Sequence, residues 1–177
     1  MDRDRKYQFT WDLLGDLAEG RPNLGHMMRI EVYRLMQYCF RDILEDRFGN
    51  EEADAITFQA GYLAGTHFYR QLIGKIEGIG DLVKKLQTVL KDLGIGILRI
   101  EEHDEETNRI VMTVSEDLDC SGLPELSYEV CTYDEGFIAA ILESALGKKF
   151  EVKEIDCWCT GDRTCRFQAI PVDEKLQ

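Results

Sequence analysis

The sequence of 177 residues predicts an α+β fold in which helices pack on a small antiparallel sheet. Apolar residues recur at helical spacing through the first half of the chain. In the second half, short segments with strand-like alternation come in two pairs, and one helical segment lies between the pairs. This order of helices, hairpin, helix and hairpin differs from the regular strand–helix alternation of a doubly wound parallel sheet.

Three amphipathic helices are expected in the first half, at residues 30–48, 51–73 and 79–93. Gly49 lies where the first helix should end, and Gly94 lies where the third should end. Each helix carries its apolar side chains on one side and its charged side chains on the other. We expect the apolar sides to face the core.

The second of these helices carries two glycines four residues apart, Gly61 and Gly65. Glycine costs stability inside a helix, so the close approach of another backbone or of a ligand is needed to explain the pair. Packing against another backbone is the simpler explanation. A pocket beside the two glycines is the alternative.

The second half should form two hairpins with a helix between them. The expected strands and the intervening helix are, in order, residues 97–101, 109–115, 134–146 (helix), 150–157 and 165–170. The acidic run at residues 101–106 fits a solvated hairpin end better than a cation site.

The chain is acidic, with 21 Lys and Arg against 34 Asp and Glu and a net charge of −13. Such a surface repels phosphate backbones and anionic lipid, so neither nucleic acid nor a membrane is an expected partner. The first residues are charged, and no apolar run reaches the roughly 18 residues of a membrane span. We therefore expect a cytoplasmic protein.

Four of the six cysteines lie in the final third, at Cys131, Cys157, Cys159 and Cys165. In a reducing compartment they favour free thiols or metal ligands over disulfides. Cys157 and Cys165 should face each other across the last hairpin, and Cys159 shares their face. With Cys131 and Glu154 they offer a plausible four-ligand set, although joint ligation by Glu154 and Cys157 requires a bulge in the strand. A set of small buried residues, or a Cys157–Cys165 disulfide, would also explain the pattern.

No catalytic constellation stands out. The chain has no glycine-rich nucleotide loop, no phosphate loop and no Gly-x-Ser-x-Gly elbow, and its three histidines are far apart. An enzyme is therefore not the expected class. Aromatic residues could line a small-molecule pocket, although a place in the core is the simpler explanation for each of them.

A pattern of cysteines, an acid and a turn glycine runs through the last third of the chain. It consists of Cys131, Glu154-Ile-Asp-Cys157 and Gly161-Asp-Arg-Thr-Cys165-Arg-Phe. This pattern resembles the 4-vinyl reductase domain family, and residues 24–35 with the glycine pair resemble the family's N-terminal half. We therefore expect a single domain over residues 1–177, with its core at about 24–170.

The resemblance implies a fold shared with haem-based nitric-oxide-sensing domains and with vesicle-tethering (TRAPP) subunits, in which a helical layer packs on a small antiparallel sheet. Members are usually dimeric. They include an accessory protein of bacteriochlorophyll synthesis and the sensor domains of activators that detect phenols. In those sensors a zinc ion bound by three cysteines and one glutamate supports the pocket. The resemblance places a structural zinc on Cys131, Glu154, Cys157 and Cys165, with Cys159 left over.

The expected function is that of a binding or sensing module for a small hydrophobic molecule, apolar or aromatic. The module has a structural zinc and no output domain of its own, and it would act as a homodimer on a regulatory protein partner. The residues expected to line its pocket are Gly61, Tyr62, Gly65, Phe68, Tyr69, Phe137 and Trp158. Two alternatives stay open: a tetrapyrrole vinyl reductase or its accessory protein, and a dimeric scaffold or tethering protein.

Overall fold

The computed structural model describes residues 6–172, and its centre is a four-stranded antiparallel sheet. The strands are β1 (Ile97–His103), β2 (Ile110–Ser115), β3 (Phe150–Asp156) and β4 (Cys165–Pro171). β1 pairs with β2 and β3 pairs with β4, and the two hairpins join through β2 and β4 to give the order β1-β2-β4-β3. The antiparallel sheet is the one that the sequence predicts.

The helices are α1 (Leu17–Gly20), α2 (Ile30–Phe48), α3 (Asn50–Phe68), α4 (Ile79–Asp92) and α5 (Thr132–Leu146). Three short turns accompany them: 3-10 turns at Trp11–Leu14 and Trp158–Thr160, and a π-helical turn at Tyr69–Ile73 that extends α3. Within residues 6–172, no helix combines the length and apolar character needed to cross a bilayer.

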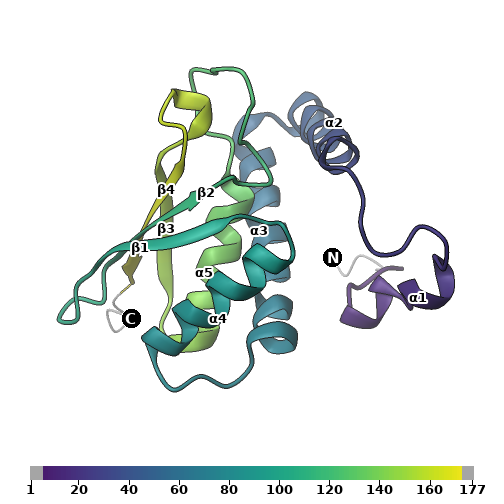
Figure 1. The fold of residues 1–177 in the computed structure, drawn as a ribbon. Coiled ribbons are helices and arrows are strands. Elements are labelled where there is room, and N and C mark those ends of the chain that lie inside the picture. Colours follow the sequence, from purple (N-terminus) through teal and green to yellow (C-terminus); the bar gives the residue numbers. More distant parts are fainter. Residues whose placement is uncertain (1–5, 173–177) are drawn as a thin grey trace.

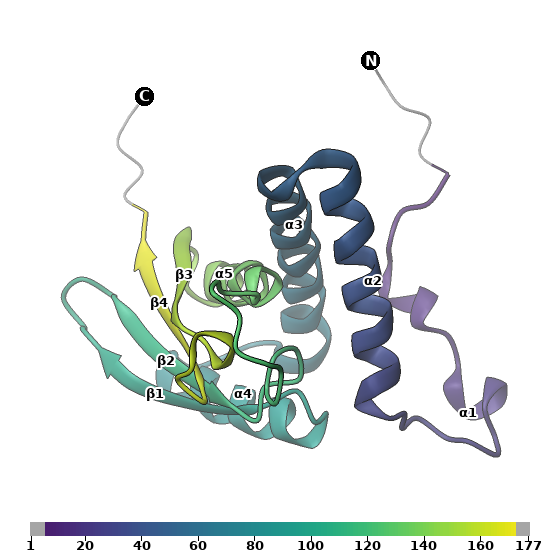
Figure 2. The same ribbon diagram turned by 90° about the horizontal axis from the view of Figure 1, so that it is seen from above.

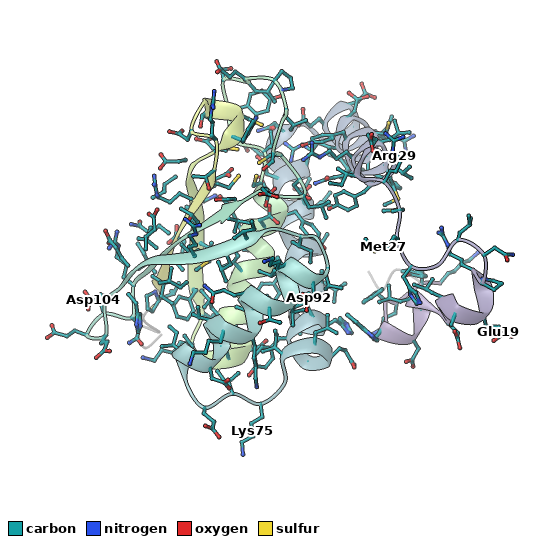
Figure 3. The ribbon with its side chains drawn as sticks, in the orientation of Figure 1. Glu19, Met27, Arg29, Lys75, Asp92 and Asp104 are labelled. Atoms are coloured by element: carbon teal, nitrogen blue, oxygen red, sulfur yellow. The ribbon has the colours of Figure 1, made fainter. Side chains whose placement is uncertain are left out.

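The elements form successive layers (Figures 1 and 2). α4 and α5 pack on the sheet, α3 packs on α5, and α2 lies along the outer side of α3. In Figure 3, Met27 and Arg29 mark the segment that leads into α2, well to one side of the sheet. The core lies between the sheet and the helices α4 and α5, where Leu82, Ile110 and Phe167 are fully buried.

The glycine pair of α3 lies at the contact between α3 and α5. A β-carbon on Gly61 would collide with the carbonyl oxygen of Tyr133, and one on Gly65 would collide with the carbonyl oxygen of Phe137. Gly136 of α5 meets the backbone of α3 in the same way. The two helices therefore approach backbone to backbone, and packing is the role that the structure assigns to these glycines.

The orientation of α2 is opposite to the one expected. Its apolar side is exposed to solvent, a surface that we call the apolar stripe of α2: Val32, Leu35, Met36, Cys39, Phe40 and Ile43. Its half-buried side is polar except for Leu44. The expectation that the apolar side faces the core is wrong for this helix.

The polar side of α2 is held by hydrogen bonds to the loop after β2. The Tyr33 hydroxyl and the Gln37 amide each donate to the Asp119 carboxylate at 2.8 Å. Arg34 Nε donates to the carbonyl oxygen of Leu118 at 2.8 Å, and the Tyr38 hydroxyl donates to the carbonyl oxygen of Asp119 at 2.9 Å. Asp119 is buried, and a buried carboxylate needs such partners. This requirement explains why the polar side faces inward.

Candidate metal centre and the cavity beside it

Four cysteines from distant parts of the sequence meet beside the β3–β4 hairpin. Cys120 lies in the loop after β2, Cys131 precedes α5, Cys157 follows β3 and Cys165 begins β4. All four are buried, and their Sγ atoms lie within 4.8 Å of one another. The Sγ–Sγ distances are 4.0 Å for Cys131–Cys157, 3.8 Å for Cys131–Cys165 and 2.9 Å for Cys120–Cys165. Tetrahedral thiolates around a zinc ion lie about 3.8 Å apart. The two distances from Cys131 match this spacing and Cys120 lies closer to Cys165, so the four-cysteine cluster could bind a metal once Cys120 and Cys165 move apart.

The local structure of the last hairpin brings its cysteines inward. The pairing of β3 with β4 shifts register between Glu154 and Asp156, which confirms the bulge that the parity argument requires. After the bulge, the backbone N–H of Cys157 donates to the Thr160 hydroxyl at 3.1 Å, and the N–H of Asp162 donates to the Cys157 carbonyl at 3.2 Å. This tight turn fixes the Cys157 side chain in the cluster.

Cys120 is the member that the sequence reasoning missed. It lies eleven positions before Cys131 and shares no ligand spacing with it. The turn that places it is built by Asp117, whose Oδ1 accepts the backbone N–H of Asp119 at 2.8 Å and that of Cys120 at 3.0 Å. The sequence signal for it is an aspartate three residues before a cysteine, directly after a strand, which is typical of a turn closed by a carboxylate.

Glu154 lies next to the four-cysteine cluster but outside the group of four. Its Oε2 accepts the backbone N–H of Cys131 at 3.4 Å, and its Oε1 has no hydrogen-bond partner among the described residues. Burial raises the pKa of Glu154 to about 8. Cys159, the other candidate ligand, is buried as well, and burial raises the pKa of its thiol to about 12. It too lies outside the group of four.

An apolar cavity of about 60 Å³ lies between α4, the sheet and α5. Aliphatic side chains of α4, β1, β2 and α5 form most of its wall, together with Phe137. Two carboxyl groups, those of Asp117 and Asp134, complete the wall. Ligand atoms of both aspartates lie within 4.8 Å of one another and of the Cys131 sulfur. The cavity and the four-cysteine cluster therefore share one wall.

The other residues expected at a pocket lie outside this cavity, and Phe68 lines a second apolar pocket of about 560 Å³ beside α3, together with Phe137. Gly61 and Gly65 pack against α5, and Tyr62 donates its hydroxyl hydrogen bond to Glu143. Phe68 packs edge to face on Phe137, with ring centroids 5.0 Å apart.

Tyr69 packs on the outside of the core, in the π-helical turn after α3. The indole N–H of Trp158 donates to the carbonyl oxygen of Leu123 at 3.0 Å, which ties the turn after β3 to the loop before α5. Of the seven residues expected at a pocket, the structure therefore brings Phe137 alone to the cavity between α4, α5 and the sheet.

Residues 110–171 match the vinyl-4-reductase domain. The match runs from the start of β2 to the end of β4, so it contains all four cysteines of the cluster. It confirms the resemblance to the 4-vinyl reductase domain family that the cysteine pattern indicates.

Similar proteins extend over the rest of the chain. An uncharacterized protein of Methanocaldococcus jannaschii is 27% identical over 99% of this chain and 96% of its own length. The phenol-responsive sensory domain of the transcription activator PoxR, solved with phenol, superposes with a TM-score of 0.64 at 14% identity, covering 84% of this chain and 77% of that one. A trafficking protein particle complex subunit 3 from Naegleria fowleri, covalently bound to palmitic acid, gives a TM-score of 0.63 at 14% identity over 81% of this chain and 95% of that one. These similarities confirm the α+β fold with TRAPP-like architecture.

Proposed function

We propose that this vinyl-4-reductase domain binds a small apolar molecule in the cavity between α4, α5 and the sheet, and that a structural zinc ion holds the wall of that cavity. The observation that carries the proposal is the shared wall: Asp117 and Asp134 line the cavity and lie beside Cys131. The likeness to a sensory domain solved with phenol supports a small-molecule ligand, as does the likeness to a subunit that carries palmitic acid.

The zinc ion would be held by Cys120, Cys131, Cys157 and Cys165. Thiolates suit zinc, and four protein ligands leave no open position for water, so the ion would be structural. The alternative set, implied by the family, has Glu154 in place of Cys120. We favour Cys120 because its Sγ belongs to the compact group of four, whereas the Glu154 carboxylate lies next to it.

Zinc content per chain separates the two sets. Native mass spectrometry of protein purified under reducing conditions without chelator should give one zinc ion per chain. Replacing Cys131, Cys157 or Cys165 with serine should abolish it in either set. Loss of zinc in C120S with retention in E154Q identifies Cys120 as the fourth ligand, and the opposite result identifies Glu154.

The control for the zinc count is C159S, which should keep its zinc ion because Cys159 lies outside the group of four. Loss of zinc in C159S would show that the chosen ligands are wrong. An unmodified protein without zinc would overturn the metal proposal as a whole.

Ligand binding can be tested with n-butanol in a methyl NMR titration of the zinc-loaded protein. Shifts should be confined to methyl groups that line the cavity, and L86F should abolish them because it fills the space. L93F is the matched control, since Leu93 is exposed at the end of α4 and does not line the cavity. Absence of any shift at millimolar alcohol would overturn the proposed function.

The apolar stripe of α2 favours a second property, association with another protein surface. Leu35 and Phe40 are 68% and 65% exposed, and apolar surface of this kind is costly in water. We propose that the stripe is the interface of a homodimer. A regulatory partner would bind this dimer and respond to whether the ligand site is occupied. If the domain binds no ligand, the same dimer would act as a scaffold.

A further inference from the structure

The side chains that line the cavity restrict which polar groups a ligand can carry. Among residues 6–172, the side chains that line the cavity apart from Asp117 and Asp134 are aliphatic, Met or Phe, and none of the lining side chains carries an N–H or O–H donor unless a carboxyl is protonated. A ligand with a carboxylate or phosphate would meet two acids and no cation there. The wall therefore selects against anions.

The two carboxyl groups differ in how they are satisfied. Asp117 Oδ1 already accepts two backbone N–H groups of its own loop. Asp134 Oδ2 is buried and has no hydrogen-bond partner among the described residues. A buried acceptor without a donor is costly, so a ligand that brings a donor to Asp134 removes that cost on binding.

We propose that the cavity takes a small primary amine, whose apolar chain fills the aliphatic part and whose amino group donates to Asp134, with Asp117 beside it. This inference rests on the proposed ligand site. An ammonium group carries three donors and no acceptor, so it matches the two carboxyl groups when both are ionised. A hydroxyl group donates once and leaves its own acceptor without a partner.

A metal ion is the rival occupant, because Asp117, Asp134 and Cys131 have ligand atoms within 4.8 Å of one another. Three protein ligands would leave a fourth position to water, and that water would face aliphatic side chains. Apolar cavities stay dry, so this arrangement is unfavourable. An amine instead places its carbon atoms against the aliphatic wall.

The volume limits the size of the amine. Apolar cavities of roughly 150 Å³ hold benzene. n-Butylamine is about as bulky as benzene, so at about 60 Å³ the cavity admits it only if the aliphatic side chains of the wall move apart. The matched probes are n-butylamine, n-butanol and propionate, which have equal numbers of non-hydrogen atoms and differ in the polar head.

The experiment is a methyl NMR titration of the zinc-loaded protein with each probe near neutral pH. We expect n-butylamine to bind at least tenfold more tightly than n-butanol, and propionate not to bind. D134N should weaken n-butylamine at least tenfold and change n-butanol less than twofold. D92N is the control, because it removes one negative charge at an exposed position of α4 and should alter none of these affinities (Figure 3).

Each contrary result has a distinct meaning. Equal binding of n-butanol and n-butylamine, unchanged in D134N, overturns the amine while leaving the proposed function in place. Binding of none of the probes overturns both. Two zinc ions per chain, reduced to one in D134N, would show that the carboxyl groups hold a second metal and would also overturn the amine. If D134N does not fold, the order of the three probes on the unmodified protein decides by itself.

Discussion

The carbonyl oxygen of Tyr133 in α5 occupies the space where a β-carbon of Gly61 in α3 would stand. The two helices can approach this closely because the side chain is absent. Glycine normally weakens a helix, but at this position the fold requires it. The contact is therefore testable by adding one methyl group.

Replacing Gly61 with alanine should lower the free energy of unfolding by about 1–3 kcal/mol, as overpacking typically does. Alanine is the better helix former, so intrinsic propensity alone predicts the opposite sign. Urea denaturation measures the difference. Gly80 in α4 is the control, because a β-carbon there meets nothing within 4 Å and G80A should be neutral or stabilising. Similar effects of G61A and G80A would contradict the close contact.

Glu135 should matter more to stability than the lysine paired with it. Its buried carboxylate accepts the backbone N–H of Glu154 at 2.9 Å and the ammonium group of Lys153 at 3.0 Å. E135A leaves the Glu154 N–H without its acceptor and should cost about 1–3 kcal/mol. K153A removes a side chain that is 65% exposed and should cost less than about 1 kcal/mol. Chemical denaturation of both variants decides; equal losses would disprove the assignment.

The contribution of Tyr62 to the free energy of unfolding should decline at alkaline pH. Burial, and then its hydrogen bond to Glu143, raises the pKa of Tyr62 to about 12, against about 10 for an unfolded tyrosine. Between these values the folded chain keeps a proton that the unfolded chain has lost, so stability falls as pH rises from about 10 to about 12. Y62F should lose about 1 kcal/mol at neutral pH and lack this part of the alkaline decline.

Denaturation of unmodified protein, Y62F and Y7F at neutral and alkaline pH tests this pH dependence. Tyr7 is 65% exposed, so Y7F should keep the full alkaline decline. An equally steep decline in Y62F would show that another group is responsible.

Removal of the metal should loosen one particular end of the molecule. The four-cysteine cluster joins the loop after β2, the start of α5 and the last hairpin, so a chelator should lower the thermal midpoint and broaden NMR signals of the 117–131 segment. C39S, at an exposed cysteine outside the cluster, should respond as the unmodified protein does. A midpoint unchanged by chelation of a zinc-loaded sample would rule out a stabilising role.

The apolar stripe of α2 should control the oligomeric state. Light scattering of the unmodified protein should give a dimer, and L35E should give a monomer because it places a charge in the interface. L93E, at an exposed leucine of similar character directly after α4, should remain dimeric. A monomeric unmodified protein at high micromolar concentration would contradict the homodimer.

The regular elements follow from local sequence. The helix predicted at residues 30–48 has those same bounds, because Gly49 supplies the positive φ of 79° that ends it. The strands agree to within two residues, and the bulge before Cys157 follows from parity alone. Each of these features depends on neighbours in the chain, so periodicity and turn chemistry suffice to find it.

The features that sequence reasoning missed depend on distant partners. Asp117 forms the turn of Cys120 locally, but the meeting of Cys120 with Cys131, Cys157 and Cys165 joins distant parts of the chain. α2 turns its polar side inward to satisfy the buried Asp119, which lies more than eighty positions along the chain from Tyr33, Gln37 and Tyr38. The cavity between α4, α5 and the sheet lies beyond α5 from the glycine pair, whereas a second apolar pocket is lined by Ala60 and Ala64, the neighbours of those glycines. No local pattern reports such pairings.

The short loop at residues 117–120 connects three sites. Asp117 lines the cavity, Cys120 belongs to the cluster, and the carbonyl groups of residues 117–119 accept the hydrogen bonds that hold α2. A ligand that displaces this loop also displaces the anchor of the helix that presents the apolar stripe. Thermodynamic linkage makes this coupling reciprocal. If such a ligand changes the association constant through α2 by some factor, association changes the affinity for the ligand by the same factor.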